Sequence, residues 1–255
     1  EKVCSVLRDT YGIGSDIDVE AIEGENWLSV PLVVDDDFFV KVITPQNTLT
    51  HAFFTGMRNL GVRMSGGGPF FETYDSTSEM ARHEYETISR MVEAGINASE
   101  PIDVIESDGF ALLVLRYLDG FSPLSSLDDT EVDSELISNV FETLRRLHDN
   151  GLAHGDFSLE NVLVVDDEIY FIDSTKVKEE RYYDAVAYDL ACALGALASR
   201  VGEETVIRAA SEFYTSDEIE HALDFLIVVR LRPGIGEGFS VRGLRKAVGG
   251  VLRES

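Results

Sequence analysis

Residues 154–161 and Asp173 combine side chains that could hold a metal ion and act on a hydroxyl group. Asp156 and Asn161 lie five residues apart in the string HGDFSLEN, and Asp173 ends the apolar string EIYFID. The strings NVLVV and EIYFID, separated by two aspartates, predict a β-hairpin. Antiparallel pairing would bring the open ends of that hairpin together, with Asp156 on the adjoining loop. Two carboxylates and an amide oxygen would then converge, and these are the hard ligands that Mg²⁺ prefers.

The spacing of these residues is similar to that of the protein-kinase catalytic motif. His154, Gly155, Asp156 and Asn161 follow the order H-R-D-L-x-x-x-N, with glycine in place of arginine, and Asp173 stands where a metal-holding aspartate follows. The chain therefore resembles RIO kinases, the small kinase of the KEOPS tRNA-modification complex, lipopolysaccharide-sugar kinases, and aminoglycoside or choline phosphotransferases. The resemblance implies ATP as the donor, Mg²⁺ or Mn²⁺ held by Asn161 and Asp173, and Asp156 orienting an acceptor hydroxyl. His154 would support the loop.

Lys41 lies in the middle of the string FFVKVI and is one of only five lysines. Taken alone, it is equally well a strand-edge lysine whose ammonium reaches solvent. The resemblance implies that it binds the α- and β-phosphates of ATP and that a glutamate on the next helix holds it. Glu84 lies in the first half of that helix and is the expected partner, with Glu86 as the fallback.

The same resemblance implies further nucleotide contacts. Gly24, the single glycine of the turn EGEN, would cover the phosphates with backbone amides, and Arg116, Tyr117 and Leu118 would contact the adenine. Asp173 is followed by Ser-Thr rather than Phe-Gly, and no A-P-E string follows. The first departure favours the atypical branch of the fold. The second argues against a large protein substrate docked on an activation segment.

The acceptor stays open at this point. A protein serine or threonine fits the RIO and KEOPS resemblance, and a sugar or aminoglycoside fits the His-Gly-Asp loop equally. A non-catalytic pseudokinase scaffold is the alternative outside enzymes, and a KEOPS-like protein would need a protein partner. Asp189, in the string AYDLACAL, is expected to cap a helix N-terminus or, by resemblance, to brace the catalytic loop.

The elements around these residues predict an α+β, bilobal, protein-kinase-like fold. Strands and one helix dominate the first half, and helices dominate the second. We expect an N-terminal nucleotide-binding lobe over 1–118, with a mobile insertion at about 44–79 that holds one helix near 47–60, and a C-terminal catalytic lobe over 119–255. Strands are expected over 18–43, 102–106 and 110–117, and helices over 79–95 and 133–151.

Composition limits the partners. The chain has 255 residues and a formal charge of −26, from 47 acidic and 21 basic side chains. Such a field disfavours nucleic acid. It is typical of proteins from the cytoplasm of a salt-accumulating organism, and the alternative is simply an acidic protein. No apolar run approaches the roughly 18 residues of a membrane helix, and no signal peptide is evident, so we expect a cytoplasmic protein. Because the chain begins at Glu1 rather than Met, residues upstream are expected to be missing.

Overall fold

The computed structural model describes residues 2–12, 18–21, 29–64, 68–232, 235 and 238–251. The chain divides into two compact units. The first holds Glu1–Thr55, Thr73–Val92 and Ser99–Asp119, and the second holds Gly56–Glu72, Glu93–Ala98 and Gly120–Ser255. Residues 56–72 and 93–98, expected in the N-terminal lobe, therefore cluster with the second unit.

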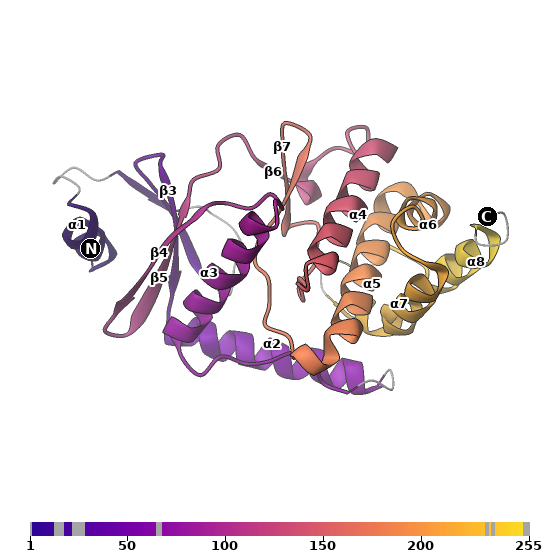
Figure 1. The fold of residues 1–255 in the computed structure, drawn as a ribbon, viewed down its shortest axis with the longest axis horizontal. Coiled ribbons are helices and arrows are strands. Elements are labelled where there is room, and N and C mark those ends of the chain that lie inside the picture. The colour runs from indigo at the N-terminus through magenta and orange to yellow at the C-terminus, as the bar shows by residue number, and fades with distance from the viewer. Residues whose placement is uncertain are drawn as a thin grey trace. The chain divides into compact units, whose positions relative to one another are not determined.

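The first unit is built on a five-stranded antiparallel sheet in the order β1-β2-β3-β5-β4 (Figure 1). Every strand pair along this order is antiparallel. The elements of the unit are α1 (Lys2–Tyr11), β1 (Val19–Ala21), β2 (Val30–Val34), β3 (Phe38–Ile43), α3 (Thr77–Glu93), β4 (Pro101–Ser107) and β5 (Phe110–Arg116), together with the first part of α2 (Pro45–Met64).

Two hairpins of the chain turn on paired aspartates. Asp35 and Asp36, between β2 and β3, have φ angles of 53° and 55°, and Asp166 and Asp167 have φ angles of 49° and 66°. Tight hairpin turns of this kind need positive φ at both central residues, and aspartate tolerates that region better than most residues. The Asp-Asp pairs therefore fix the register of the strands on either side.

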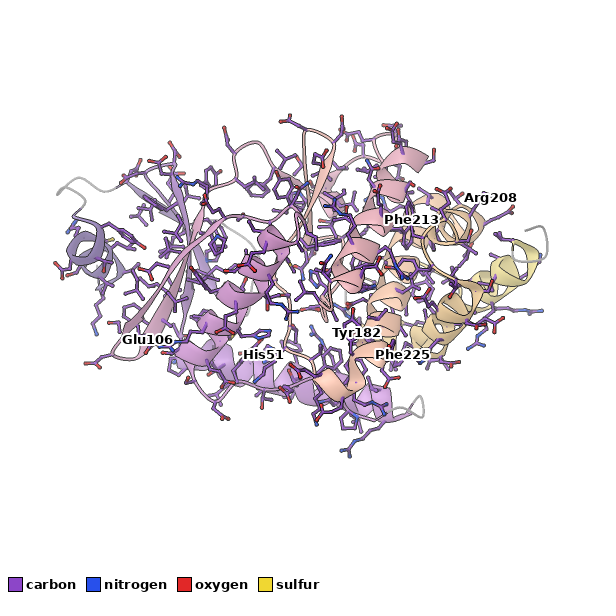
Figure 2. The ribbon with its side chains drawn as sticks, in the orientation of Figure 1. His51, Glu106, Tyr182, Arg208, Phe213 and Phe225 are labelled. Atoms are coloured by element: carbon purple, nitrogen blue, oxygen red, sulfur yellow. The ribbon has the colours of Figure 1, made fainter. Side chains whose placement is uncertain are left out.

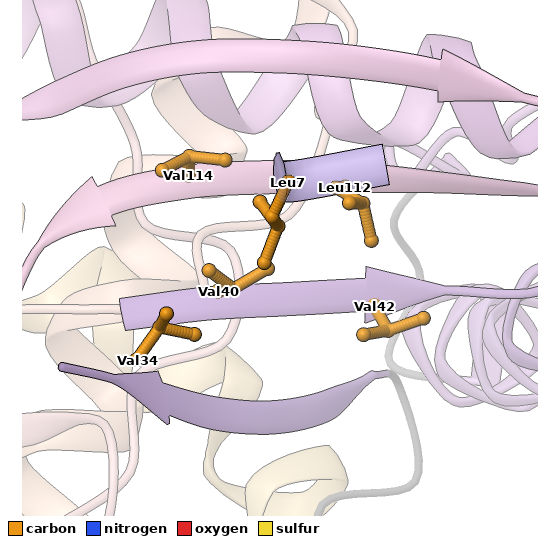
Figure 3. Close-up of a cluster of buried hydrophobic side chains, with 6 residues drawn as sticks. All are labelled: Leu7, Val34, Val40, Val42, Leu112 and Val114. Carbon is orange, nitrogen blue, oxygen red and sulfur yellow. The ribbon is translucent and has the colours of Figure 1, made fainter. Parts of the chain in front are cut away.

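Alternation along β3 and β5 places Lys41 on the face of the sheet opposite one of its apolar clusters. Val40, Val42, Leu112 and Val114 are buried in one cluster with Leu7 of α1 and Val34 (Figure 3). Successive side chains of a strand point to opposite faces. Lys41 therefore points away from this cluster, to the other side of the sheet.

The second unit is mainly helical and carries a small antiparallel sheet in the order β6-β7-β8. Its most buried helix, α5, packs against α4, α6 and α7 (Figure 1). A helix that is apolar on all sides, as α5 is, belongs in the interior. The elements are β6 (Ser122–Pro123), α4 (Ser134–Asp149), β7 (Val162–Val165), β8 (Glu168–Phe171), α5 (Tyr182–Val201), α6 (Glu203–Ala210), α7 (Ser216–Val229) and α8 (Val241–Val251), with 3₁₀ turns at Leu124–Ser126 and Glu179–Arg181.

Helix α4 forms where its apolar spacing predicts it. Asp133 caps its N-terminus, because the carboxylate accepts a hydrogen bond of 2.9 Å from the Leu136 amide. The six side chains of its predicted apolar face are buried: Leu136, Ile137, Val140, Phe141, Leu144 and Leu147. At its end, the carbonyl of His148 accepts a hydrogen bond from the hydroxyl of Tyr182 in the first turn of α5 (Figure 2). This bond joins α4 to α5 at the level of the loop that follows α4.

Residues 44–79 are more ordered in secondary structure than the sequence suggests. Helix α2 runs for 20 residues, beyond the helix expected near 47–60, and α3 begins at Thr77. The expected mobility of this segment stays a prediction. None of the helices in the described part of the chain has the length and apolar character needed to cross a lipid bilayer.

Candidate active site

Lys41 and Glu84 form a buried ion pair in the first unit. The ammonium of Lys41 contacts Oε1 of Glu84, and the two side chains are only 3% and 10% exposed. Lys41 comes from the face of β3 opposite the Leu7 cluster, and Glu84 from the buried face of α3. Glu86, the fallback partner, is exposed. The structure therefore joins the lysine and the glutamate that the sequence analysis paired.

The second unit brings the loop after α4 together with the open end of the β7–β8 ribbon. The amide of Ile172 donates a hydrogen bond of 3.1 Å to the carbonyl of Asn161, which sets the residue before Asp173 opposite Asn161. Nδ2 of Asn161 donates to the carbonyl of Asp156 at 2.9 Å. That bond fixes the side-chain amide so that its oxygen remains an acceptor.

Asn161 and Asp173 offer two oxygen donors of the type that Mg²⁺ takes. Mg²⁺ is usually bound through one or two carboxylates together with substrate phosphates. In the described part of the chain, no group of three or more His, Cys, Asp or Glu side chains is arranged to hold a metal. Two oxygen donors of this type fit an ion whose remaining ligands are phosphate oxygens and water. Asp173 has a φ of 60°, a rare conformation for a residue other than glycine and one that occurs often at functional positions.

The carboxylate of Asp156 is held by two arginines that the sequence analysis did not single out. Oδ1 accepts hydrogen bonds from Arg58 of α2 at 2.6 Å and from Arg232 after α7 at 2.5 Å. All three side chains are largely buried. A sequence signal for Arg58 did exist: residues 38–71 contain no Asp or Glu, although the chain has 47 of them.

The two arginines set the charge state of Asp156. Burial raises the pKa of this carboxyl, but the charges of Arg58 and Arg232 outweigh burial and hold the pKa below its ordinary value. Asp156 is therefore a carboxylate over the whole neutral range. It is better suited to orienting a hydroxyl than to taking a proton from it unaided.

His154 and Asp189 support the backbone of this loop from behind. The amides of His154 and Gly155 donate to the two oxygens of Asp189 at 2.6 and 2.8 Å, and Nε2 of His148 lies 3.3 Å from the same carboxylate. Nδ1 of His154 accepts a bond of 3.2 Å from the Asp156 amide, and burial lowers the pKa of His154, so that its ring is neutral. Asp189 is thus a brace for the loop.

The alternative prediction, that Asp189 caps a helix N-terminus, is wrong. Helix α5 begins at Tyr182, seven residues earlier, and Asp189 is fully buried in its middle. The bonds it accepts from the loop amides compensate its charge there.

Gly155 replaces the arginine of the usual motif for a steric reason. Its φ is 73°, and an added Cβ would lie 2.9 Å from the carbonyl oxygen of Thr175 and 3.2 Å from Val177. The Thr175 amide also donates to the carbonyl of His154 at 2.7 Å. The segment after Asp173 therefore lies against the catalytic loop at a distance that only glycine permits.

The other expected nucleotide contacts are less defined. Gly24 and the turn EGEN lie outside the described residues. The backbone amide of Arg116 donates to the carbonyl of Glu100 at 2.8 Å, and that of Tyr117 donates to the carbonyl of Asp37 at 2.9 Å. Both amides are therefore already engaged within the first unit. Leu118, which follows β5, is half-buried. Contact of these residues with adenine stays a prediction.

Solved structures with the same fold identify the class. A GDP complex of an aminoglycoside 2′-phosphotransferase-IIIa variant covers 99% of this chain and 95% of its own, with a TM-score of 0.53 and 13% identity. At that identity the likeness concerns the fold alone, which is α+β and protein-kinase-like. A family model described as the RIO domain matches residues 71–200, just over half of the chain. The chain belongs to the RIO family.

Two curated relatives agree with this family. A RIO-type serine/threonine-protein kinase Rio1 of Thermoplasma acidophilum is 31% identical over 93 residues, which is 36% of this chain and 47% of that protein. A probable bifunctional tRNA threonylcarbamoyladenosine biosynthesis protein of Methanosarcina acetivorans is 26% identical over 140 residues, 54% of this chain and 25% of that protein. The chain thus matches less than half the length of either relative.

Proposed function

We propose that this protein is an ATP- and Mg²⁺-dependent phosphotransferase of the atypical serine/threonine kinase type, which transfers the γ-phosphate of ATP to a hydroxyl group. The observation that carries the proposal is the buried ion pair of Lys41 and Glu84. Removing a charged side chain from water costs on the order of several kcal/mol per ion. A buried ion pair is therefore weak evidence for a purely stabilising role. A lysine ammonium held in place for phosphate oxygens explains why this pair is kept.

Each residue of the site then has one task. Lys41, oriented by Glu84, binds the α- and β-phosphates. Asn161 and Asp173 hold Mg²⁺, which neutralises charge on the phosphates when it is bound. Asp156 accepts a hydrogen bond from the acceptor hydroxyl and directs its oxygen toward the γ-phosphorus. An oxygen–phosphorus bond forms, the bond from the γ-phosphorus to the β–γ bridging oxygen breaks, ADP leaves, and the hydroxyl proton passes to solvent.

The printed names of the relatives support two finer parts of the proposal. The Thermoplasma relative is named a serine/threonine-protein kinase, which supports a protein hydroxyl as acceptor. The Methanosarcina relative is named bifunctional, and this chain covers a quarter of it, which supports work alongside a partner protein. One assay with labelled ATP tests both the acceptor and the partner. The chain itself, basic proteins and sugars are compared as acceptors, before and after addition of co-purifying protein.

The role of Lys41 is tested with a double variant. Lys41→Met alone would take the Lys41 charge away from the buried Glu84 carboxylate, which is expected to destabilise the protein. Lys41→Met combined with Glu84→Gln removes both charges together, so we expect a melting temperature near that of the wild type and at least a 100-fold loss of Mg-ATP turnover. A folded double variant that turns over ATP at the wild-type rate would remove the basis of the proposal.

A further inference from the structure

The carboxylate of Asp156 is shared by two guanidinium groups. Arg58 and Arg232 both donate to the same oxygen, Oδ1. Among the described residues, Oδ2 of Asp156 accepts no hydrogen bond. His154, which lies next to this group, is neutral because burial lowers its pKa. Two guanidinium groups thus meet at a single carboxylate oxygen, and the nearby Asp189 carboxylate is engaged by the amides of His154 and Gly155.

Contacts behind each arginine hold it in place independently of Asp156. The Arg58 guanidinium lies 5.6 Å from the ring centroid of Phe71, and Asn59, the next residue of α2, bonds the backbone of Phe71. These contacts hold this part of α2 against the segment that contains Phe71. They also limit the positions that the Arg58 guanidinium can take.

Arg232 is held in the same way. Its Nη1 donates to the carbonyl of Phe157 at 2.9 Å and lies 3.1 Å from Sγ of Cys192, and its guanidinium lies 5.9 Å from the Tyr188 ring centroid. Burial raises the pKa of the Cys192 thiol to about 11, so the sulfur is neutral and supplies no counter-charge.

Two positioned guanidinium groups that share one carboxylate oxygen and are largely withdrawn from water are a strong arrangement for binding a carboxylate or phosphate. The acid-free run over residues 38–71 points the same way, because it keeps other carboxylates away from Arg58 in sequence.

We propose that Arg58 and Arg232 form an anion-binding site beside Asp156, so that the acceptor carries a carboxylate or phosphate group next to the hydroxyl that receives phosphate. The part of this inference that concerns an acceptor rests on the proposed function. It disfavours aminoglycosides and basic peptides as substrates. The anion site itself is defined by the two arginines and does not depend on phosphoryl transfer.

The test is calorimetric titration of the full chain with inorganic phosphate, without nucleotide or divalent metal. We expect Arg58→Met to weaken phosphate binding at least tenfold, because one of the two cations is lost. Asp156→Asn should tighten it several-fold, because the competing carboxylate is lost while both cations remain. Arg208→Met is the matched control: Arg208 is an exposed arginine on α6 paired with Glu204, and its loss should leave the affinity unchanged (Figure 2).

Two results would overturn the anion site: no phosphate binding to the wild-type protein, or equal affinity in the wild type, Arg58→Met and Asp156→Asn. Circular dichroism of each variant shows whether it is folded, and the opposite sign expected for Asp156→Asn separates anion binding from a general loss of structure.

A second arm uses labelled ATP and pairs of acceptors matched except in charge: glycerol against glycerol 3-phosphate, and serine peptides with aspartate or lysine neighbours. Preference for the anionic member supports the inference and shows whether a small molecule or a peptide supplies the anion. Preference for the cationic member contradicts it. If no acceptor is labelled, the proposed function fails, and the phosphate titration still decides the anion site.

Discussion

Gly155 shows how one residue adapts the catalytic loop to its surroundings. Its positive φ and the 2.9 Å approach of the Thr175 carbonyl oxygen both exclude a side chain. Gly120 has a similar φ of 68° but no atom within 4 Å of the position of an added Cβ. The two glycines therefore separate the cost of backbone strain from the cost of a steric clash.

Gly155→Ala should destabilise the protein more than Gly120→Ala. Left-handed backbone costs an alanine about 1 kcal/mol at either position, and the clash with Thr175 adds roughly 2 kcal/mol at position 155, in the usual range for a steric conflict in a packed region. Urea unfolding of both variants measures the difference in the free energy of unfolding. Equal losses of unfolding free energy in the two variants would show that the segment after Asp173 moves aside at no cost and would contradict this prediction.

At this scale, the sequence was informative wherever the site is local. Asp156, Asn161 and Asp173 lie within 18 residues of one another on a predictable hairpin, so their spacing alone indicates the ribbon end. Arg58 and Arg232 reach Asp156 across 98 and 76 residues. Contacts over such separations depend on how helices pack, and no periodicity in the chain encodes them.

Asn59 connects the second part of helix α2 to residues 70 and 71 of the second unit. Oδ1 of Asn59 accepts bonds from the amides of Phe70 and Phe71, both at 3.1 Å, and its Nδ2 donates to the Phe71 carbonyl at 2.9 Å. Phe71 in turn forms an antiparallel bridge with Val177, and the Lys178 amide donates to the Phe70 carbonyl at 2.8 Å. Asn59 thereby connects α2 to the segment after Asp173.

Asn59→Ala should loosen both segments that this side chain connects. The loss leaves two backbone amides without their partner, at a cost of about 2 kcal/mol in total. Hydrogen exchange followed by mass spectrometry should show faster exchange over 68–72 and 176–178, whereas Asn97→Ala, which removes a surface bond to Glu168, should leave these peptides unchanged. Unchanged protection in Asn59→Ala would assign the order of this segment to the aromatic packing alone.

Elements with their own periodicity were predictable, and those defined by long-range packing were not. The apolar face and the N-cap of α4 are encoded by residues that lie close together in the sequence. The start of α5 at Tyr182 was hidden, because residues 182–188 mix aromatic, acidic and small side chains without a clear cap; the structure shows no side-chain cap there. β6 has two residues and exists through its pairing with β7.

Charge is the main property of the molecule as a whole. A formal charge of −26 destabilises a compact chain through self-repulsion, which salt reduces. Many of the ion pairs involve exposed side chains, such as Arg82 with Glu106 and Arg208 with Glu204. Exposed pairs of this kind contribute little each and cannot offset an excess of 26 negative charges.

Stability should therefore rise with ionic strength. The Debye length falls from about 10 Å at 0.1 M to about 3 Å at 1 M, so most of the gain in melting temperature should come below 1 M KCl. Calorimetry over 0.1–3 M KCl and NaCl measures this gain, with an equal concentration of sucrose as the control for general exclusion effects. A melting temperature that does not change with salt would contradict the salt-adapted interpretation.

The most direct test of the central claim is transfer of labelled γ-phosphate from ATP, with Mg²⁺ and high salt, by the wild type, Asp173→Asn and Glu160→Gln. Asparagine tolerates the left-handed backbone of position 173 but lacks the negative charge, so Asp173→Asn should keep its circular dichroism and lose at least 1000-fold in turnover. Glu160→Gln, an exposed change in the same loop, should stay at the wild-type rate. Wild-type turnover in Asp173→Asn, or no transfer by the wild type with any divalent metal at any salt concentration, would contradict the account.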